Sequence, residues 1–242
     1  MATATQRVAA RPRDYVRVAG PDAAGFLQRM LSNDVEQAPC EALLLTPKGR
    51  IVAPLRVLRR APDDFLLLTE PGLGETVRAT LLRARFAARC ELEPEEHTAV
   101  LVWEGDFAAA REELDVGLEP TAGEDALERA RIEAGIPAWG NELDESILPA
   151  EAGLDETHIS FGKGCYPGQE PVARLHYRGH PNRSLRRLAA ESARPGEELR
   201  YDGKVVGRIT SAVPGIALGY VRVEVPQRAE LELESGNARS LD

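Results

Sequence analysis

Three short apolar runs between residues 41 and 69 constrain the fold of this chain more than any other feature. The runs EALLL (41–45), RIVAPLRVL (50–58) and FLLLT (65–69) have the composition of strands, and TPKG and RAPDD between them have the composition of turns. The spacing predicts two hairpin turns and an antiparallel meander. None of these runs is long enough to cross a membrane as a helix.

Helical patterns flank the meander. PDAAGFLQRMLSND (21–34) carries one apolar stripe with Asp22 at the position of an N-cap, and GLGETVRATLLRARFAA (72–88) has apolar residues at helical intervals. A strand-like run, HTAVLVW, follows at 97–103. Strands and helices alternate without the regular spacing of βαβ units, which predicts a compact α+β unit over residues 41–118.

The C-terminal half contains one further helix pattern and a strand-rich end. EPTAGEDALERARIEAGIP (119–137) predicts a helix that ends near Gly135, with Pro137 as a stop. Residues 139–179 have little periodicity and many Gly, Pro and polar residues, which is typical of a functional segment. From residue 181 onward, short strands predict a small β-barrel or sandwich, with glycine turns at Gly196, Gly203, Gly207 and Gly215.

The charge of the chain is negative overall but unevenly distributed. Its net charge of -9 argues against general affinity for nucleic acid or anionic membranes. Six Lys or Arg and one acid lie between Lys163 and Arg187, so this basic strip has a local balance of +5. Such a strip can hold a carboxylate tail or a phosphate, or lower the pKa of a nearby thiol.

Cys40, Cys90 and Cys165 are the three cysteines, and they form no C-x-x-C pair. This pattern favours a reducing cytoplasm and indicates neither a disulfide scaffold nor a metal site. Cys165 lies two residues from Lys163, in a setting that can lower a thiol pKa. The alternative is a buried thiol acting as a small hydrophobe in a tight turn.

Three histidines surround Cys165 in the sequence, which raises the alternative of a Cys-His nucleophile pair. Solvated or hydrogen-bonded histidines are the favoured interpretation, and the spacing of HYRGH predicts a loop or strand. The residues are His158, His176 and His180.

KGCYPGQE (163–170) followed by VARLHYRG (172–179) resembles the signature of the YgfZ-type folate-binding proteins, which are relatives of the glycine-cleavage T-protein, an aminomethyltransferase. FLQRMLSNDV (26–35) resembles the family's first helix, RIEAGIPAWGNELDESILPAEAGL (131–154) its folate-site stretch, and ALGYVR (217–222) a barrel strand. The signature positions in this chain are Lys163, Gly164, Cys165, Tyr166, Gly168, Gln169 and Glu170.

The resemblance implies an α+β fold of three subdomains in a cloverleaf. A discontinuous folate-binding core would hold residues 1–40 and 119–180. A ferredoxin-like α+β domain would be inserted at 41–118, and a C-terminal β-barrel would hold residues 181–242.

The resemblance also implies a site for tetrahydrofolate or a derivative. Glu133 falls on the family's pterin-binding glutamate, and a carboxylate can accept two N–H bonds from a pterin edge. The alternative for Glu133 is a surface acid paired with Arg129. Asn141 and Asp144 resemble site-lining positions, with a turn role as the alternative. We expect Arg174 and Arg178 to suit the glutamate tail of folate.

One stretch departs from the T-protein pattern. T-proteins carry an acidic pair after the glycine turn, whereas here KGRIVAPLRV (48–57) places Ala53 and Pro54 at those positions. Neither side chain can serve as an acid or a base, so we expect no aminomethyltransferase activity.

For YgfZ-type proteins the family implies support of iron–sulfur cluster assembly or repair, and so of tRNA modification by cluster enzymes. In this chain Cys165 would carry that task, with assembly factors or cluster-containing proteins as partners and no membrane. Two alternatives are a folate-dependent one-carbon transferase with Cys165 as nucleophile, and an RNA-associated module that uses Arg174 to Arg187.

Overall fold

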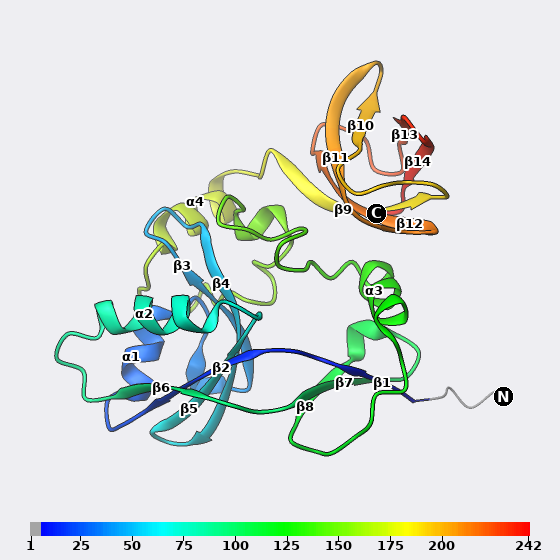
Figure 1. Cartoon of the computed structure of the whole chain (residues 1–242). Helices are drawn as coiled ribbons and strands as arrows, with labels where there is room; N and C mark the ends of the chain where they lie inside the picture. Colours follow the sequence, from blue (N-terminus) through cyan, green and yellow to red (C-terminus); the bar gives the residue numbers. More distant parts are fainter. Residues whose placement is uncertain (1–5) are drawn as a thin grey trace. The chain divides into compact units, whose positions relative to one another are not determined.

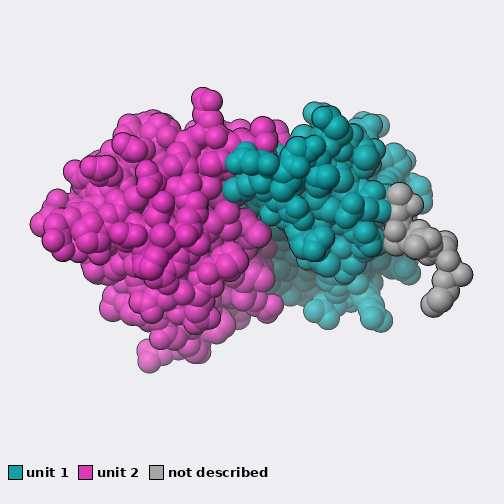
Figure 2. Space-filling view, turned by 90° about the horizontal axis from the view of Figure 1, so that it is seen from below, with its two compact units in different colours: residues 1–11, 99–143, 181–242 teal, residues 12–98, 144–180 magenta. Residues whose placement is uncertain are grey.

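The structure is a computed structural model that describes residues 6–242. The chain divides into two compact units (Figures 1 and 2). Of the described residues, the meander unit holds 12–98 and 144–180, and the barrel unit holds 6–11, 99–143 and 181–242. Within the described part of the chain, no helix is long and apolar enough to span a membrane.

The meander unit is built on a five-stranded antiparallel sheet with the order β3-β4-β5-β2-β6. The predicted meander is confirmed, because Leu44 lies opposite Ala53 and Val57 opposite Leu67 across its two hairpins. The five strands are β2 (Asp14–Ala19), β3 (Cys40–Leu45), β4 (Ile51–Ala61), β5 (Asp64–Thr69) and β6 (Glu91–Glu95).

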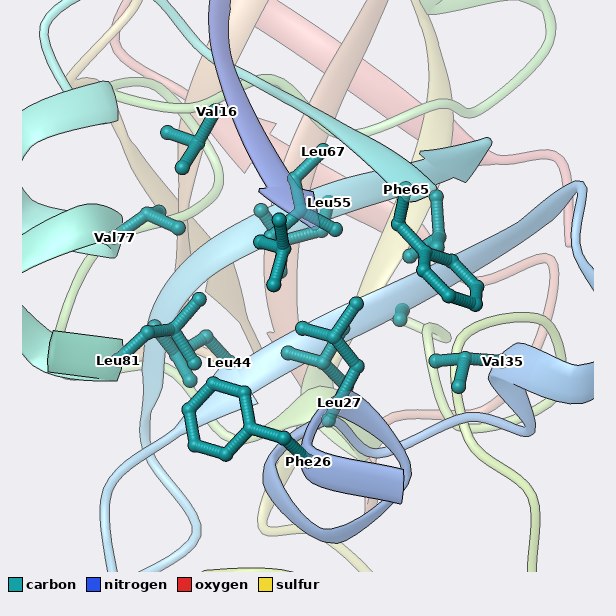
Figure 3. Close-up of a cluster of buried hydrophobic side chains, with 14 of the residues drawn as sticks. Val16, Phe26, Leu27, Val35, Leu44, Leu55, Phe65, Leu67, Val77 and Leu81 are labelled. Carbon is teal, nitrogen blue, oxygen red and sulfur yellow. The ribbon is translucent and has the colours of Figure 1, made fainter. Parts of the chain in front are cut away.

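Helices α1 (Ala23–Met30) and α2 (Gly74–Ala84) pack against this sheet. Figure 3 shows Phe26 from α1 next to Leu81 from α2, with Leu27 and Val77 in the same cluster of apolar side chains. Each such fully buried side chain stabilises the fold by roughly 1.5–3 kcal/mol. The same unit contains η1 (Val35–Gln37), η3 (Pro149–Glu151) and α4 (Gln169–Arg178).

Two details of these helices differ from the sequence predictions. The Asp22 side chain makes no capping bond to α1 and instead accepts from the Arg89 backbone N–H at 2.8 Å. Residues 169–178 form helix α4, although no periodicity was expected there and HYRGH was predicted as loop or strand. Pro171 is tolerated because it lies in the first turn, where backbone N–H groups have no helical partner.

The N-terminal part of the barrel unit is a three-stranded sheet with one helix. β1 (Arg7–Ala10), β7 (Ala99–Trp103) and β8 (Arg111–Leu114) pair in the order β1-β7-β8. η2 (Phe107–Ala109) and α3 (Glu124–Glu133) follow the strands, and Trp103, Phe107 and Ala130 share a small core.

The predicted division at residues 40, 118 and 180 does not coincide with the two units. Strand β7 pairs with β1, which lies more than 80 residues earlier in the sequence. Residues 99–118 therefore belong to the barrel unit and not to the unit that contains residues 41–98. A short strand pattern predicts the strand but carries no information about its pairing partner.

The C-terminal strands form a closed six-stranded barrel, as predicted, with the order β10-β11-β12-β9-β14-β13. Gly207 does not form the predicted turn. It lies within β11 opposite Val221, where a Cβ atom would come within 2.1 Å of the Tyr220 carbonyl oxygen. The strands are β9 (Arg183–Ala190), β10 (Glu198–Tyr201), β11 (Lys204–Val213), β12 (Gly215–Arg222), β13 (Glu230–Leu233) and β14 (Gly236–Ser240).

Candidate functional site

Cys165 lies in the meander unit on the segment between η3 and α4. We call residues 161–168 the thiol loop. The Cys165 side chain is a free thiol and is exposed to solvent, as is the neighbouring Gly164. The alternative of a buried cysteine acting as a small hydrophobe is therefore wrong.

The segment before the thiol loop is fixed to the end of α1 through Ser32, which is completely buried. The Ser32 hydroxyl donates to the His158 carbonyl oxygen at 2.6 Å and accepts from the Leu43 N–H at 2.8 Å. The Ser32 carbonyl oxygen accepts from the Ser160 N–H at 3.0 Å. Asn33 adds a bond from its Nδ2 to the Thr157 carbonyl oxygen at 3.2 Å. These bonds tie residues 157–160 to both α1 and β3.

Lys163 joins the loop itself to the same helix end. Its Nζ donates to the carbonyl oxygens of Leu31 at 2.6 Å and Asn33 at 2.8 Å. Both carbonyls belong to the extended chain that follows α1, and each can accept a hydrogen bond from an ammonium group. Burial lowers the pKa of Lys163 to about 8, against the opposing charges of Asp34 and Cys40. Lys163 therefore positions the loop through backbone carbonyls; its predicted action on Cys165 stays a prediction.

Tyr166 anchors the loop on the other side of Cys165. Its side chain is 6% exposed, and the ring lies 5.4 Å from the Lys163 ammonium. Burial raises the pKa of Tyr166 to about 12, so the phenol is neutral over the physiological range. Among the residues that the structure describes, its buried hydroxyl has no hydrogen-bond partner.

Gly168 and Gly49 bring the start of α4 against the turn between β3 and β4. Gly168 has φ +84°, and a Cβ atom there would lie 2.5 Å from the Thr46 carbonyl oxygen. A Cβ atom on Gly49 would lie 3.1 Å from Pro171 Cγ. Only glycine suits position 168, because the left-handed backbone and the close approach both exclude a side chain.

Aromatic contacts join the thiol loop to α4. The first turn of this helix contains Gln169 and Glu170. The Phe161 ring stacks on His176 with centroids 3.9 Å apart and an interplanar angle of 19°. His176 Nδ1 also lies 3.5 Å from Asp155 Oδ2. The thiol loop is thus held at both ends while its middle, Gly164 and Cys165, faces solvent.

His158 has a structural environment. It is half-buried, its Nδ1 lies 2.8 Å from the Thr157 hydroxyl, and burial lowers its pKa to about 4. His158 is therefore neutral at pH 7, in line with the interpretation as a hydrogen-bonded residue.

The predicted basic strip does not form one uniform cationic surface. Arg174 and Arg178 are exposed one helical turn apart on α4, whereas Arg183, Arg186 and Arg187 belong to β9 of the barrel unit. Arg186 is buried and donates to the Val225 carbonyl oxygen at 2.9 Å, and Arg187 pairs with Asp242 at 2.6 Å. These internal bonds count against the RNA-associated alternative.

Glu133 is the last residue of α3, and the helix ends as predicted at Gly135. Gly135 has φ +71° and donates to the Ile132 carbonyl oxygen at 3.0 Å, while Ile136 N–H donates to the Arg131 carbonyl oxygen at 3.1 Å. These two bonds form a Schellman motif. The Glu133 side chain is 53% exposed and its Oε1 accepts from Arg129 at 3.3 Å, which is the contact that the surface-acid alternative expects.

A buried charged network joins Arg131 of α3 to Glu142 and to Ser211 of β11, and no local sequence pattern indicates it. The Glu142 side chain is 0% exposed and accepts from Arg131 at 2.9 Å, from Ser211 at 2.7 Å and from the Ala138 N–H at 2.9 Å. Ser211 also accepts from Asn141 Nδ2 at 3.2 Å. The network therefore fixes Asn141 against strand β11.

Asp144 lies in the meander unit and makes a turn. Its Oδ1 accepts from the Ser146 N–H at 2.6 Å, and its carbonyl oxygen accepts from the Ile147 N–H at 3.2 Å. The predicted folate residues are thus divided between the units. Glu133 and Asn141 belong to the barrel unit, and Asp144, Arg174 and Arg178 to the meander unit.

Ala53 and Pro54 lie in the middle of β4 and are both buried. The Pro54 carbonyl oxygen accepts from the Thr69 hydroxyl at 2.9 Å. Over residues 6–242, no three His, Cys, Asp or Glu side chains are grouped so that they could hold a metal ion.

Comparison with known proteins relates the whole chain to two groups. No protein-family model matches it. An uncharacterized protein of Haemophilus influenzae is 28% identical over 82% of this chain and 81% of its own length. The tRNA-modifying protein YgfZ of Klebsiella pneumoniae is 27% identical over 90% of this chain and 84% of its own length. The chain is a homologue of YgfZ.

The fold of this YgfZ homologue is that of an aminomethyltransferase. The crystal structure of glycine cleavage system aminomethyltransferase T from Bartonella henselae superposes with a TM-score of 0.84, over 98% of this chain and 85% of that one, at 20% identity. An aminomethyltransferase of Caldanaerobacter subterraneus is 35% identical over 49% of this chain and 30% of its own length. These likenesses confirm the family resemblance and the fold class predicted from the sequence.

Proposed function

We propose that this chain binds a reduced folate and supports iron–sulfur cluster assembly or repair through Cys165, and thereby tRNA modification by cluster enzymes. The observation that carries the proposal is the exposed Cys165 thiol on a loop that is held at both ends. The name of the Klebsiella pneumoniae relative supports the link to tRNA modification, and the aminomethyltransferase fold supports the link to folate.

The residues present fit a folate ligand chemically. The half-exposed carboxylate of Glu133 can accept N–H bonds from a pterin edge. The Asn141 amide of the same unit is held in place by Ser211. On the meander unit, taken by itself, the exposed guanidinium groups of Arg174 and Arg178 have the chemistry to bind carboxylates such as those of a glutamate tail. Folate would supply a one-carbon carrier; this chain would bind and orient it.

The chemistry excludes one reaction that the fold otherwise suggests. Aminomethyl transfer in T-proteins is assisted by an aspartate at the positions that Ala53 and Pro54 occupy here. Neither side chain can accept or hold a proton, so we propose binding without aminomethyl transfer.

Cys165 suits a transient role with a partner protein. A thiolate ligates iron in clusters, and a cluster normally takes four protein ligands. Cys165 would supply one of them while a partner supplies the others. Alternatively, the Cys165 thiolate would attack a disulfide already present in a partner, forming a mixed disulfide and releasing the partner's other cysteine as a thiolate. Because Cys165 is exposed on a loop that is held at both ends, its thiol is accessible to a partner protein in either case.

Calorimetric titration of tetrahydrofolate tests the folate part of the proposal. We expect wild type and Cys165→Ser to bind and Glu133→Ala to lose binding. If wild type shows no heat of binding under conditions where a T-protein control binds, the folate assignment is wrong.

Complementation tests the role of the thiol. A bacterial strain that lacks its own YgfZ would express this chain, and mass spectrometry would quantify the tRNA nucleosides made by cluster enzymes. We expect wild type and the matched control Cys40→Ser to restore them, and Cys165→Ser to fail at equal protein level. Full restoration by Cys165→Ser would remove the thiol from the mechanism.

A further inference from the structure

The turn between α2 and β6 in the meander unit has properties that the proposed function does not use (Figure 1). We call residues 85–89 the arginine turn. The Phe86 side chain at its tip is 92% exposed, and its backbone has φ +44°. A bulky residue rarely adopts a positive φ, and soluble proteins rarely leave a whole aromatic ring in solvent. Phe86 therefore has two unfavourable features at one position.

Two open hollows border the arginine turn. They have volumes of about 530 and 520 Å³, and both are lined by Pro21, Arg85 and Ala88. The first is also lined by the apolar side chains of Phe26 and Met30. A large side chain from another molecule could enter this hollow and at the same time cover the Phe86 ring.

The surroundings of the turn are basic, in a chain whose net charge is -9. Arg29, Arg85 and one acid, Asp22, line the first hollow. Arg17, Arg85, Arg89 and one acid, Glu91, line the second, and Arg83 is exposed on the last turn of α2. Arg89 pairs with Asp22 at 3.1 Å. Within residues 6–242 the structure shows no ion pair for Arg29, Arg83 or Arg85. The patch thus keeps an excess of positive charge next to an exposed aromatic ring.

We propose that the arginine turn is a docking surface for an acidic peptide segment of a partner protein, with a large apolar side chain that enters the hollow beside Phe86. Aromatic residues and arginine are the side chains most often responsible for binding energy at protein interfaces. Uncompensated cations attract a partner of opposite charge and accelerate its association. A peptide is favoured over nucleic acid because the hollow has an apolar wall, with Phe26 and Met30 in its lining, which suits an apolar side chain.

The strained backbone supports a role in binding over a role in folding. Glycine or asparagine at position 86 would adopt the left-handed backbone with less strain. Replacing Phe86 with glycine removes no buried contact, since almost all of the ring is exposed. The proposal depends on neither folate binding nor Cys165.

Selection from a phage-displayed library of random 12-residue peptides on the full-length chain tests the proposal. We expect enriched sequences that combine several Asp or Glu with one large apolar residue. A synthetic, fluorescein-labelled peptide of the enriched sequence would then be titrated by fluorescence anisotropy. We expect its affinity to fall at least tenfold in Phe86→Gly and in the double variant Arg29→Glu with Arg85→Glu, and to fall with rising salt.

Two controls separate docking from damage to the fold. The melting temperature of Phe86→Gly should equal or exceed that of wild type, whereas a structural role for Phe86 would lower it. Arg222→Glu, an exposed charge reversal on the barrel unit, should leave peptide affinity unchanged.

Four results would overturn the proposal. The first is a selection without acidic enrichment, and the second is equal binding of the enriched peptide by Phe86→Gly. The third is self-association of wild type that Phe86→Gly abolishes in sedimentation velocity, which would identify a second copy as the occupant. The fourth is binding of a 20-nucleotide single-stranded RNA that depends on Phe86, which would identify nucleic acid.

Discussion

Each unit contains a cationic side chain that is largely removed from solvent, and the two differ in their hydrogen-bond partners. They are Arg131 in the barrel unit and Lys163 in the meander unit. Arg131 donates to Glu142 at 2.9 Å and to Glu128 at 2.6 Å, and it also bonds Ser211. Lys163 donates to two backbone carbonyl oxygens, and no carboxylate in the described residues lies within ion-pair distance of it.

The pKa shifts of the two cations have opposite directions. Burial alone lowers the pKa of Arg131, but the hydrogen bonds that Arg131 donates to Glu128 and the charge of Glu142 outweigh it and raise the pKa. For Lys163 burial outweighs the charges of Asp34 and Cys40 and lowers the pKa to about 8. A planar guanidinium can bond several partners at once, whereas an ammonium is a compact, strongly hydrated charge.

The two candidate site regions are therefore stabilised by different kinds of interaction. Asn141 in the barrel unit is positioned by a charge network whose members compensate one another. The thiol loop is positioned by a cation whose burial is only partly compensated. We therefore expect the barrel-unit network to depend on the presence of each partner and the thiol loop to depend on pH.

Removing Glu142 should have the largest effect. Glu142→Gln leaves Arg131 buried with one carboxylate fewer, and breaking a buried ion pair in this way costs about 3–5 kcal/mol of unfolding free energy. Urea unfolding followed by tryptophan fluorescence measures it, since both Trp103 and Trp139 lie in the barrel unit.

Glu128→Gln is the matched control, because Glu128 bonds the same guanidinium but is 38% exposed. We expect this variant to cost about 1 kcal/mol or less, as for exposed ion pairs. Equal losses in the two variants would contradict the view that burial makes Glu142 the critical partner.

Removing the Lys163 ammonium should have a smaller and more local effect. Lys163→Met keeps the aliphatic stem but leaves the Leu31 and Asn33 carbonyl oxygens without this donor, which costs about 1–3 kcal/mol. Amide hydrogen exchange by mass spectrometry should show faster exchange over residues 157–165 and no change in the barrel unit. Unchanged exchange over 157–165 would mean that Ser32 and Tyr166 hold the loop without Lys163.

The sequence predicts the local elements of this protein well and its long-range contacts poorly. The meander at 41–69, the end of α3 at Gly135 and the C-terminal barrel follow from local patterns of apolar, turn and glycine residues. Helix α4 is missed because Gly168, Pro171 and Gly179 within and beside it are typical of loops, although its apolar residues lie on one helical face.

The candidate site shows the same division between local and long-range information. The signature points to Cys165, and the structure adds that the thiol is exposed and that the loop is held at both ends. The Arg131–Glu142–Ser211 network could not be predicted, since residues 131 and 211 meet only after the barrel has closed. The excess of arginine around Phe86 is visible in the sequence RARFAARC (83–90), but the exposure of the ring is a property of the folded chain.

The smallest expected effect is the pH dependence of the unfolding free energy that Lys163 causes. It also tests most directly whether the burial of Lys163 is less well compensated than that of Arg131. An unfolded lysine has a pKa near 10.5, so between about pH 8 and 10.5 the unfolded chain keeps a proton that folded Lys163 loses. Stability rises with pH wherever the unfolded state binds more protons. The wild type should therefore gain stability relative to Lys163→Met as pH rises above 8, by at most about 1.4 kcal/mol per pH unit.

Urea unfolding of both proteins between pH 7.5 and 9 measures this difference. The pH range stops at 9 because Cys40 titrates above it. Burial raises the pKa of Cys40 to about 11 in the folded chain, so the unfolded chain loses this thiol proton at a lower pH than the folded chain does. This difference lowers the stability at higher pH. Cys40→Ala, made in both proteins, removes that opposing contribution. If the difference between wild type and Lys163→Met stays constant with pH, the carbonyl oxygens of Leu31 and Asn33 compensate the burial of Lys163 as fully as the carboxylates compensate that of Arg131.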